Sequence, residues 1–350
     1  MKALIIEDAD RWQRILDRLT YDVYHMYDYA QMSAEQEKGK AILFVAEEGD
    51  SVLCLPLIIK PVALILDRQL NDAASPYGYP GPLMYTQDSE SQNDFTLASL
   101  KALRDYCQSN NIISVFTRFH PILAPVLDAY NRIGTLIAHG ETVSINLTFE
   151  EEEIWRQYRR NHRAGINKLR RSSAVVLVDQ DWDYYSEFLD LYTETMIRHS
   201  AAEQYFFSVQ YFNDLRKVLG QHLCLCVVKI NEQVACAGMF TEINGIVQYH
   251  LGGTKNDFKK YAPNKLMVDY MRRWSKERGN KILHLGGGVG AQKDSLFHFK
   301  AGFSSVRHNF YTWRMVIDDR LYTAMTRQWE SMHNCKADAR EGFFPAYRKN

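Results

Sequence analysis

The order of the predicted helices and strands is the feature that most constrains the fold, because one order occurs twice along the chain. Each half begins its sheet with a hairpin, in which two strand-like runs flank a short polar turn. These hairpins are predicted at Ala41 to Lys60, around Glu48-Gly49-Asp50, and at Leu223 to Ile243, around Asn231-Glu232. A third strand, a helix, a strand, a helix and a last strand then follow each hairpin. This repeat of architecture, without a repeat of sequence, predicts two mixed sheets, each flanked by helices.

Hydrophobic periodicity places the remaining elements of each half. In the first half we expect helices near 10–19 and 94–109, a helix ending near 131, and strands near 62–66, 112–119 and 143–149. In the second half we expect helices near 151–171, 184–198 and 263–279, and strands near 246–251, 282–290 and 306–317. A chain of 350 residues is long enough for two ordinary domains. We therefore expect an N-terminal domain at 1–150, a C-terminal domain at 151–320, and a C-terminal helix and tail at 321–350.

Composition excludes several classes of protein. The chain has 42 Lys plus Arg and 42 Asp plus Glu residues, so its net charge does not indicate a general binder of polyanions, and a nucleic-acid contact would need a local patch. The N-terminus becomes acidic at Glu7, too early for a secretory signal, and the longest apolar runs are too short to span a bilayer. The six cysteines form no C-x-x-C pair, so we expect neither a metal site nor a disulfide framework, and a cytoplasmic location.

A glycine cluster follows the predicted strand that starts at Ile282. The glycines of Gly286 to Gly288 interrupt an alternating apolar run, and Ser295 then offers an N-cap for a short helix. A strand followed by a glycine loop and then a helix is a common way to form a ligand-binding site, because glycines let a ligand approach the backbone. Lys300 leaves this helix beside an apolar stripe. The pattern alone fits a tight connection with a surface lysine equally well.

The predicted helix near 151–171 is strongly basic. Residues 156–171 of this helix include seven basic residues and no acidic one: Arg156, Arg159, Arg160, Arg163, Lys168, Arg170 and Arg171. Helical spacing puts Arg159, Arg163 and Arg170 on one flank. Because like charges this close repel one another, we expect the helix to bind an anion rather than to be only a solvated face. The candidate anions are a transfer-RNA backbone, a nucleotide-sugar pyrophosphate and an anionic lipid headgroup.

Three strings carry a resemblance to a known family. Leu296 to Phe303 is similar to a Phe-Lys-x-Gly-Phe signature, Ser75 to Pro82 is similar to a Tyr-Gly-Tyr-x-Gly-Pro loop, and Phe343 to Arg348 resembles a C-terminal ending. With the doubled order of elements, these strings resemble the Fem-type aminoacyltransferases that build peptidoglycan cross-bridges. Those enzymes have two tandem domains of the acetyltransferase fold called GNAT. The resemblance implies an α/β chain of the α+β kind, in which each domain has a mixed, mostly antiparallel sheet flanked by helices.

The resemblance also implies roles for particular residues. Lys300 matches the lysine of the signature, which stabilises the charge that develops in acyl transfer, and His298 takes the place of a tyrosine general acid. Roles in binding the donor or the acceptor fall on a larger set: Arg159, Arg163, Tyr77, Tyr79, Tyr249, Asn264, Lys265, Gly286, Gly287 and Gly288. The stretch before the helix at Pro263 lacks the glycines with which simpler GNAT enzymes bind the pyrophosphate of coenzyme A. Its helix N-terminus and lysines still offer a place for an anion.

Two hypotheses of function follow. In the first, the chain is an N-acyltransferase or aminoacyltransferase that moves a group from acyl-CoA or aminoacyl-tRNA to an amine of a cell-wall or polysaccharide precursor, with no permanently bound cofactor. In the second, it is a non-catalytic module that binds a cell-envelope precursor. No nucleophile elbow surrounds the serines or cysteines, which favours direct transfer without a covalent enzyme intermediate. Transfer RNA and a peripheral contact with a membrane are candidate partners, and the sequence leaves the oligomeric state open.

Overall fold

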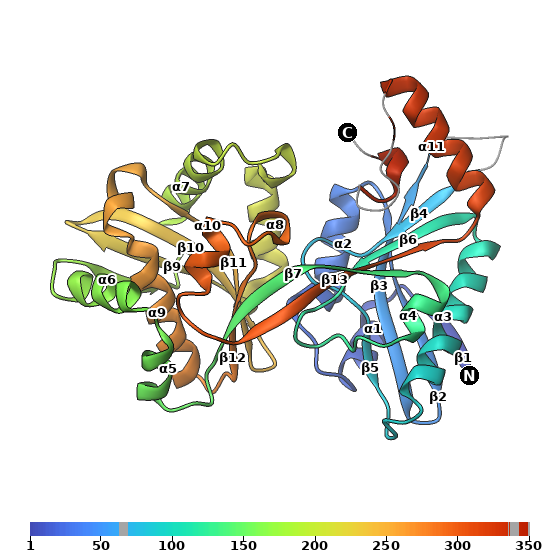
Figure 1. Ribbon diagram of the computed structural model, residues 1–350, viewed down its shortest axis with the longest axis horizontal. Coiled ribbons are helices and arrows are strands. Elements are labelled where there is room, and N and C mark those ends of the chain that lie inside the picture. The colour runs from blue at the N-terminus through green and yellow to red at the C-terminus, as the bar shows by residue number, and fades with distance from the viewer. Residues whose placement is uncertain (63–68, 335, 337–342, 349–350) are drawn as a thin grey trace. The chain divides into compact units, whose positions relative to one another are not determined.

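The computed structural model describes residues 1–62, 69–334, 336 and 343–348 (Figure 1). The chain divides into two compact units. Unit 1 is formed by residues 1–139 together with 310–350, and unit 2 by residues 140–309. No helix among the described residues combines the length and the hydropathy needed to cross a bilayer.

Two neighbouring strands determine where the units divide. The boundary passes through both β7 (Thr135–Asn146) and β13 (Arg307–Val316). The hydrogen-bonded order of the strands is β1-β2-β3-β4-β6-β13-β7-β12-β11-β10-β9-β8, with β5 paired to β3. The sequence suggested two separate sheets, whereas this order continues without a break through β13 and β7. The division also differs from the one expected at residue 150, because β13 carries the chain back into unit 1.

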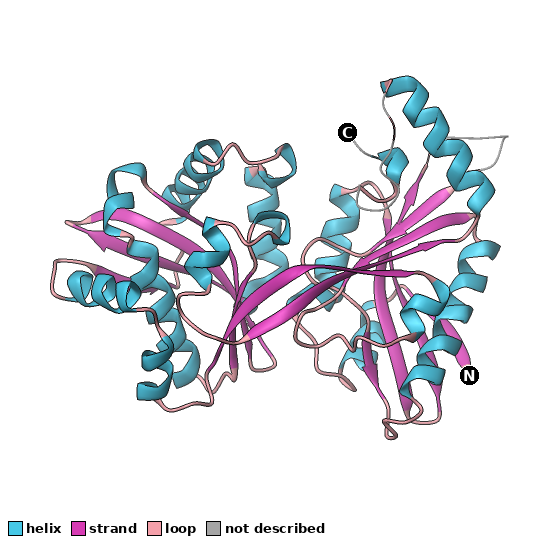
Figure 2. Cartoon of the chain, viewed as in Figure 1, coloured by secondary structure: helices cyan, strands magenta, loops and turns pink. Residues whose placement is uncertain are grey.

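Unit 1 is a three-layer unit in which helices cover both faces of its strands (Figure 2). Alternate residues of one strand point to opposite faces, so Leu43 packs with α1 and α2 while Ile42 and Phe44 pack with α3. Besides β7 and β13, its elements are β1 (Lys2–Ile6), α1 (Ala9–Leu16), α2 (Tyr27–Gln36), β2 (Lys40–Glu48), β3 (Ser51–Pro61), β4 (Asn71–Ala74), β5 (Leu83–Tyr85), α3 (Gln92–Ser109), β6 (Ile112–Arg118), α4 (Ala129–Ile133) and α11 (Asp319–His333).

Unit 2 repeats this layering. Leu283 and Leu285 of β12 pack with α5, α6, α9 and α10 on one face of the strands. The other face carries α7, which approaches β11 closely: a Cβ added to Gly253 would lie 2.4 Å from the Leu191 carbonyl oxygen. Its elements are α5 (Glu151–Gln157), α6 (Arg160–Arg170), β8 (Val175–Asp179), α7 (Tyr185–Arg198), α8 (Val209–Leu219), β9 (Leu223–Ile230), β10 (Gln233–Ile243), β11 (Ile246–Thr254), α9 (Pro263–Glu277), β12 (Ile282–Gly286) and α10 (Ser295–Lys300).

One parallel strand pair occurs at the same place in each unit. β4 pairs in parallel with β6 across the α3 connection, and β11 pairs in parallel with β12 across the α9 connection. The other strand pairs with a determined register are antiparallel, including both predicted hairpins, β2–β3 and β9–β10. The structure therefore confirms the predicted fold class, a mixed and mostly antiparallel sheet flanked by helices, with the same arrangement in both halves.

Several local predictions need correction. The predicted basic helix is two helices, because Tyr158 and Arg159 have extended backbone angles and the ring of Tyr158 is buried. Elements β1, α2, β8 and α8 were not predicted. The strand that follows the hairpin of unit 1 is β4, while the predicted strand near 62–66 falls mostly on residues 63–68, outside the described residues. The N-cap of α10 is Asp294 rather than Ser295, since its carboxylate accepts from the Phe297 amide.

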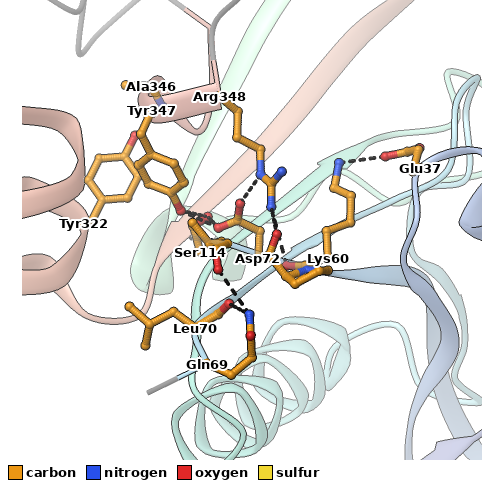
Figure 3. Close-up of polar contacts among 12 residues, drawn as sticks. Glu37, Lys60, Gln69, Leu70, Asp72, Ser114, Tyr322, Ala346, Tyr347 and Arg348 are labelled. Carbon is orange, nitrogen blue, oxygen red and sulfur yellow. Dashed lines mark hydrogen bonds and ion pairs between the residues drawn. The ribbon is translucent and has the colours of Figure 1, made fainter. Parts of the chain in front are cut away.

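The C-terminal residues 343–348 are attached to unit 1 through a buried carboxylate (Figure 3). Asp72 on β4 is 1% exposed. Its carboxylate accepts hydrogen bonds from the Ser114 hydroxyl at 3.0 Å, from the Tyr347 hydroxyl and from the Arg348 guanidinium. Arg348 also donates to the backbone carbonyl of Pro61 at 2.8 Å. These donors satisfy a charge whose burial would otherwise be costly.

Candidate active site

The glycine loop after β12 is held in place by a lysine and an aspartate. β12 ends at Gly286, whose φ of 77° favours glycine, and Lys300 Nζ donates to the carbonyl oxygen of Gly287 at 2.7 Å. Asp294 accepts from the amides of Val289 at 3.0 Å and Phe297 at 2.8 Å. The loop and α10 therefore place the Lys300 ammonium next to Gly287, directly after the end of β12.

The charge of Lys300 has no carboxylate partner at ion-pair distance among the described residues. Its side chain is half-buried, and burial lowers its pKa from 10.5 to about 8, an effect that nearby Asp294 opposes. A partly desolvated ammonium whose one hydrogen-bond acceptor is a backbone carbonyl still has donors for a further negative group. Such a perturbed group is more typical of a functional site than of a surface lysine.

The glycines of the loop make close contacts with the chain itself. A Cβ added to Gly287 would lie 2.9 Å from the Glu141 carbonyl oxygen, and one added to Gly288 would lie 2.1 Å from the Gln292 carbonyl oxygen. Side chains at these two positions are therefore excluded by the protein's own backbone. This contact explains why glycines are needed here without any ligand, and it supports the tight-connection interpretation of Gly287 and Gly288.

The parallel strands β11 and β12 separate next to this loop. Their pairing covers Ile246 to Gln248 and Ile282 to His284, whereas β11 continues to Thr254. Open sheets with a parallel strand pair bind ligands at the carboxyl ends of such strands. Tyr249 follows the last paired residue of β11, and its ring stacks on Phe240 with 4.9 Å between the centroids. Burial raises the pKa of the Tyr249 hydroxyl far above its usual value, so this tyrosine stays neutral.

The first turn of α6 is attached to the end of α10. The Arg159 amide donates to the Gly302 carbonyl oxygen at 2.8 Å, and Arg159 Nη1 donates to the His298 carbonyl oxygen at 3.1 Å. His162 Nε2 donates to the Phe299 carbonyl oxygen at 2.9 Å, and a Cβ on Gly302 would lie 2.3 Å from that ring nitrogen. The glycine of the signature is therefore required by His162, which the sequence gave no reason to select.

His298 is not brought to Lys300. Its imidazole is exposed, and it lies two positions before Lys300 on α10, so the two side chains leave the helix on different sides. Its backbone carbonyl, rather than its ring, is engaged by Arg159. The geometry gives no support to the predicted general-acid role of His298.

The cations of the basic stretch divide into structural and unpaired ones. Arg170 pairs with the fully buried carboxylate of Asp269 at 2.5 Å, and Arg272, also fully buried, pairs with the same carboxylate at 3.1 Å. Arg170 therefore connects α6 to α9, which corrects the prediction that it binds an anion together with Arg159 and Arg163. Arg163 is half-buried, Arg160 is exposed, and neither side chain has a polar partner among the described residues.

The N-terminal turn of α9 lies beside α6. Lys265 Nζ is 3.5 Å from the Asn161 carbonyl oxygen, and burial lowers the pKa of Lys265. A Cβ added to Gly165 would lie 3.8 Å from Lys265 Nζ, so the ammonium lies next to α6 at this position. Asn264, one position earlier, is half-buried. We group Lys265 of α9 with the cations of α6 that have no carboxylate partner among the described residues, and call this set the α6–α9 surface: Arg159, Arg160, Arg163, Lys168 and Lys265.

Tyr77 and Tyr79 belong to unit 1 and are described with it. The Tyr29 hydroxyl donates to the Tyr77 carbonyl oxygen at 3.0 Å. The ring of Tyr79 packs edge-on against Tyr24, at 5.8 Å between centroids, and Phe310, at 5.6 Å. Both tyrosines are half-buried, so their loop is ordered by the aromatic segment that follows α1.

Buried histidines hold the same loop, and sequence reasoning did not give them this role. His120 Nε2 donates to the Asp22 carboxylate at 2.9 Å, with both side chains fully buried. His25 Nε2 donates to the Gly81 carbonyl oxygen at 3.1 Å. Burial, with the nearby His120, lowers the pKa of His25 to about 4, so the ring is neutral at physiological pH. The buried His25, His120 and Asp22 therefore have a structural role at the loop that contains Tyr77 and Tyr79.

A shallow surface hollow of about 510 Å³ contains none of the predicted site residues. It is lined by Glu151 of α5 and by Arg273, Lys276 and Glu277 of α9. Lys276 donates to the carbonyl oxygens of Leu147 and Phe149, which indicates a structural role for this region. We therefore base the site on the glycine loop and Lys300 instead.

Comparisons with known proteins show what this chain is similar to. Residues 156–300 match the family described as acetyltransferase (GNAT) domain, a range that includes the α6–α9 surface, the split of β11 from β12, the glycine loop and Lys300. The crystal structure of FemX is similar with a TM-score of 0.71 and 13% identity, covering 93% of this chain and 99% of that chain. No curated protein matches the sequence.

Two further solved structures share the fold more distantly. The structure of L-PGS from Bacillus licheniformis has a TM-score of 0.52 and 15% identity, covering 91% of this chain and 95% of that chain. A tandem GNAT protein from the clavulanic acid biosynthesis pathway has a TM-score of 0.51 and 9% identity, covering 91% of this chain and 99% of that chain. These likenesses confirm the fold implied by the sequence resemblance, a tandem GNAT arrangement like that of FemX.

Proposed function

We propose, from the tandem GNAT fold and the Lys300 site, that this protein transfers an acyl or aminoacyl group to an amine of a cell-wall or polysaccharide precursor. The observation that carries the proposal is the half-buried Lys300 ammonium, bonded to the Gly287 carbonyl next to the place where β11 and β12 separate. Acyl transfer from an ester or thioester develops negative charge on the carbonyl oxygen and on the leaving group. A fixed ammonium with unused donors stabilises such charge.

The reaction in this proposal is a direct displacement. The acceptor amine attacks the carbonyl carbon of the donor, an amide bond forms, and the bond from that carbon to the donor oxygen or sulfur breaks. Beyond Gln248 and His284, β11 and β12 are not paired with each other, so this edge of β11 can take the acyl group as a ligand. The protein contributes orientation and electrostatic stabilisation, which are the main sources of rate enhancement when no covalent intermediate forms.

The α6–α9 surface supports an anionic donor or acceptor. Its cations lie in the same unit as Lys300, and Arg159 is bonded to α10 itself, two residues from Lys300. A transfer-RNA backbone and the phosphates of coenzyme A both suit such a surface. Tyr77 and Tyr79 of unit 1 remain proposed binding residues for the donor or the acceptor.

The two donors can be tested directly. The full chain is incubated either with radiolabelled aminoacyl-tRNA or with radiolabelled acetyl-CoA, each with a nucleotide-linked cell-wall peptide that carries a free amine, or with anionic phospholipid vesicles. Label that moves to an acceptor from one donor supports the proposal and identifies the donor class. Binding of the peptide without transfer from either donor would instead support the non-catalytic binding module.

The α6–α9 surface should govern the salt dependence of binding. Replacing Arg160, Arg163 and Lys168 with alanine is expected to weaken binding of unfractionated transfer RNA, because these cations have no protein partner among the described residues. The slope of log Kd against log salt concentration should fall by about 2 to 3, since each lost phosphate contact removes about 0.7 to 0.9. The midpoint of thermal unfolding should stay nearly unchanged because surface charges contribute little to folding.

A matched variant separates local from general charge effects. Lys217 and Lys281 are exposed lysines of unit 2 outside this surface, and their replacement by alanine should leave the salt slope unchanged. An equal loss of slope in both variants would show that only the total charge of the protein matters.

Turnover should decline as the pH rises through about 8. Burial lowers the pKa of Lys300 to about 8, so the stabilising ammonium is present below this pH and is lost above it. The pH dependence of kcat for wild type and for Lys300→Arg tests this, because the guanidinium stays charged and should remove the decline. A rate that rises through pH 8 would indicate that the neutral amine acts as a base instead.

A further inference from the structure

The proposed transfer needs a group that accepts the proton released by the acceptor amine. A general base of this kind typically contributes about 10² to 10⁴ in rate. Lys300 as an ammonium cannot accept a proton, and the His298 ring is exposed on another side of α10. A second candidate is a buried histidine on β12, the strand that leads into the glycine loop.

His284 lies two residues before Gly286 and is fully buried. Its Nδ1 bonds to Oε1 of Gln248 on β11, and its Nε2 lies 2.8 Å from Oγ1 of Thr142 on β7. A carboxamide oxygen can only accept, so Nδ1 carries the proton and Nε2 accepts from the Thr142 hydroxyl. Gln248 thus orients a neutral ring whose basic nitrogen faces Thr142.

Thr142 connects this histidine to the candidate active site. A Cβ added to Gly287 would lie 3.7 Å from Cγ2 of Thr142, and the carbonyl of this same glycine accepts the Lys300 ammonium. Thr142 and Lys300 therefore both lie next to Gly287. Gln248 and His284 are also the last paired residues of β11 and β12, so their contact lies where these strands separate.

We propose that Thr142, His284 and Gln248 form a proton relay for the acceptor amine; this rests on the transferase function proposed above. As the amine nitrogen bonds to the donor carbonyl carbon, its proton passes to Oγ1 of Thr142 while the hydroxyl proton passes to Nε2 of His284. The ring becomes an imidazolium, the bond to the leaving group breaks, and the imidazolium then returns the proton through Thr142 to that group. Gln248 is the positioning residue, because it fixes the tautomer without contacting the substrate.

The three side chains are buried and hydrogen-bonded in series, so bulk water does not compete for the contact between Thr142 and His284. Thr142 is 2% exposed, and His284 Nε2 is the partner of its hydroxyl among the described residues. A similar contact between β7 and its other neighbour, β13, provides an internal comparison. Ser144 is 2% exposed as well, and its hydroxyl lies 2.7 Å from Nε2 of His308. Ser144 lies two residues beyond Thr142 on β7 and pairs with His284, before the start of the glycine loop.

Kinetics of hydroxyl variants test the relay. With whichever labelled donor the wild type uses, Thr142→Val should lower kcat about 100-fold while the KM for the donor stays the same, because valine keeps the shape but lacks the hydroxyl. Thr142→Ser should recover most of the loss. The matched control Ser144→Ala should retain kcat within about threefold, since a single buried hydroxyl outside the proton path affects folding rather than transfer.

A second measurement needs no substrate. The nitrogen chemical shifts of the histidine rings in the full chain, labelled with nitrogen-15, should show the Nδ1–H tautomer for His284 at neutral pH. The Nε2–H tautomer, or a Thr142→Val variant whose kcat stays within about threefold of wild type, overturns the relay. A wild type that transfers from neither donor overturns the proposed function, and with it the relay, so the two failures are distinguishable.

Discussion

Replacing Lys300 with methionine is expected to lower the turnover of acyl transfer by about two to three orders of magnitude. Removing one preorganised donor to a developing oxyanion typically costs about 2.7 to 4 kcal/mol of transition-state stabilisation. Methionine retains much of the length of the side chain but removes the ammonium that donates to Gly287. Single-turnover rates for wild type and Lys300→Met, with the donor that the wild type uses, measure this loss.

Two further variants help to interpret the result for Lys300→Met. Lys300→Arg should recover part of the rate if charge is the main requirement, and little of it if a compact ammonium must fit beside Gly287. Lys293 lies in the same loop, is exposed and pairs with Glu141 at 2.9 Å, so Lys293→Met should transfer at nearly the wild-type rate. Equal rates for wild type and Lys300→Met would remove Lys300 from the mechanism.

Replacing Asp72 with alanine is expected to lower the free energy of unfolding by about 3 to 5 kcal/mol. The carboxylate is buried, and its loss removes the acceptor that the hydroxyls of Ser114 and Tyr347 share with the guanidinium of Arg348 (Figure 3). A loss of this size corresponds to a fall of roughly 6 to 20 °C in the unfolding midpoint. Differential scanning calorimetry of the full chain measures it.

An exposed aspartate of the same unit serves as the control. Asp128 pairs with Arg132 at 3.1 Å on α4 with both side chains largely exposed, so Asp128→Ala should cost less than about 1 kcal/mol. Similar losses for the two variants would mean that the contacts of Asp72 contribute no more than a surface pair. Tyr347→Phe should fall between them, because it removes a single hydrogen bond to the carboxylate.

Elements with a strong local pattern were predicted well. The hairpins β2–β3 and β9–β10 consist of apolar runs joined by a short polar turn, and both formed with the expected pairing. The helix α9 begins at Pro263 and buries Leu266, Met267 and Met271, as its periodicity indicated. These patterns depend on residues within one or two turns or one strand, which is the range over which propensity and periodicity act.

Elements whose pattern was weak or misleading were missed. The break between α5 and α6 cannot be read from a continuous run of good helix formers, since it depends on the buried ring of Tyr158 and its contact with Arg272 at 3.3 Å. The role of Arg170 likewise depends on Asp269, which is 99 residues away along the chain. A run of basic residues has the same sequence pattern whether its side chains face solvent or a buried carboxylate.

The sequence by itself determined the order of the elements, the tandem fold and the position of Lys300 after a glycine loop, because each is encoded in neighbouring residues. The tertiary structure alone decided what these residues contact. It bonds Lys300 to Gly287, places Thr142 beside His284 from 142 residues away, and brings Arg348 to Asp72 from 276 residues away. Such partners are selected by the burial of charge and by the pairing of distant strands, and neither leaves a signal within a short stretch of sequence.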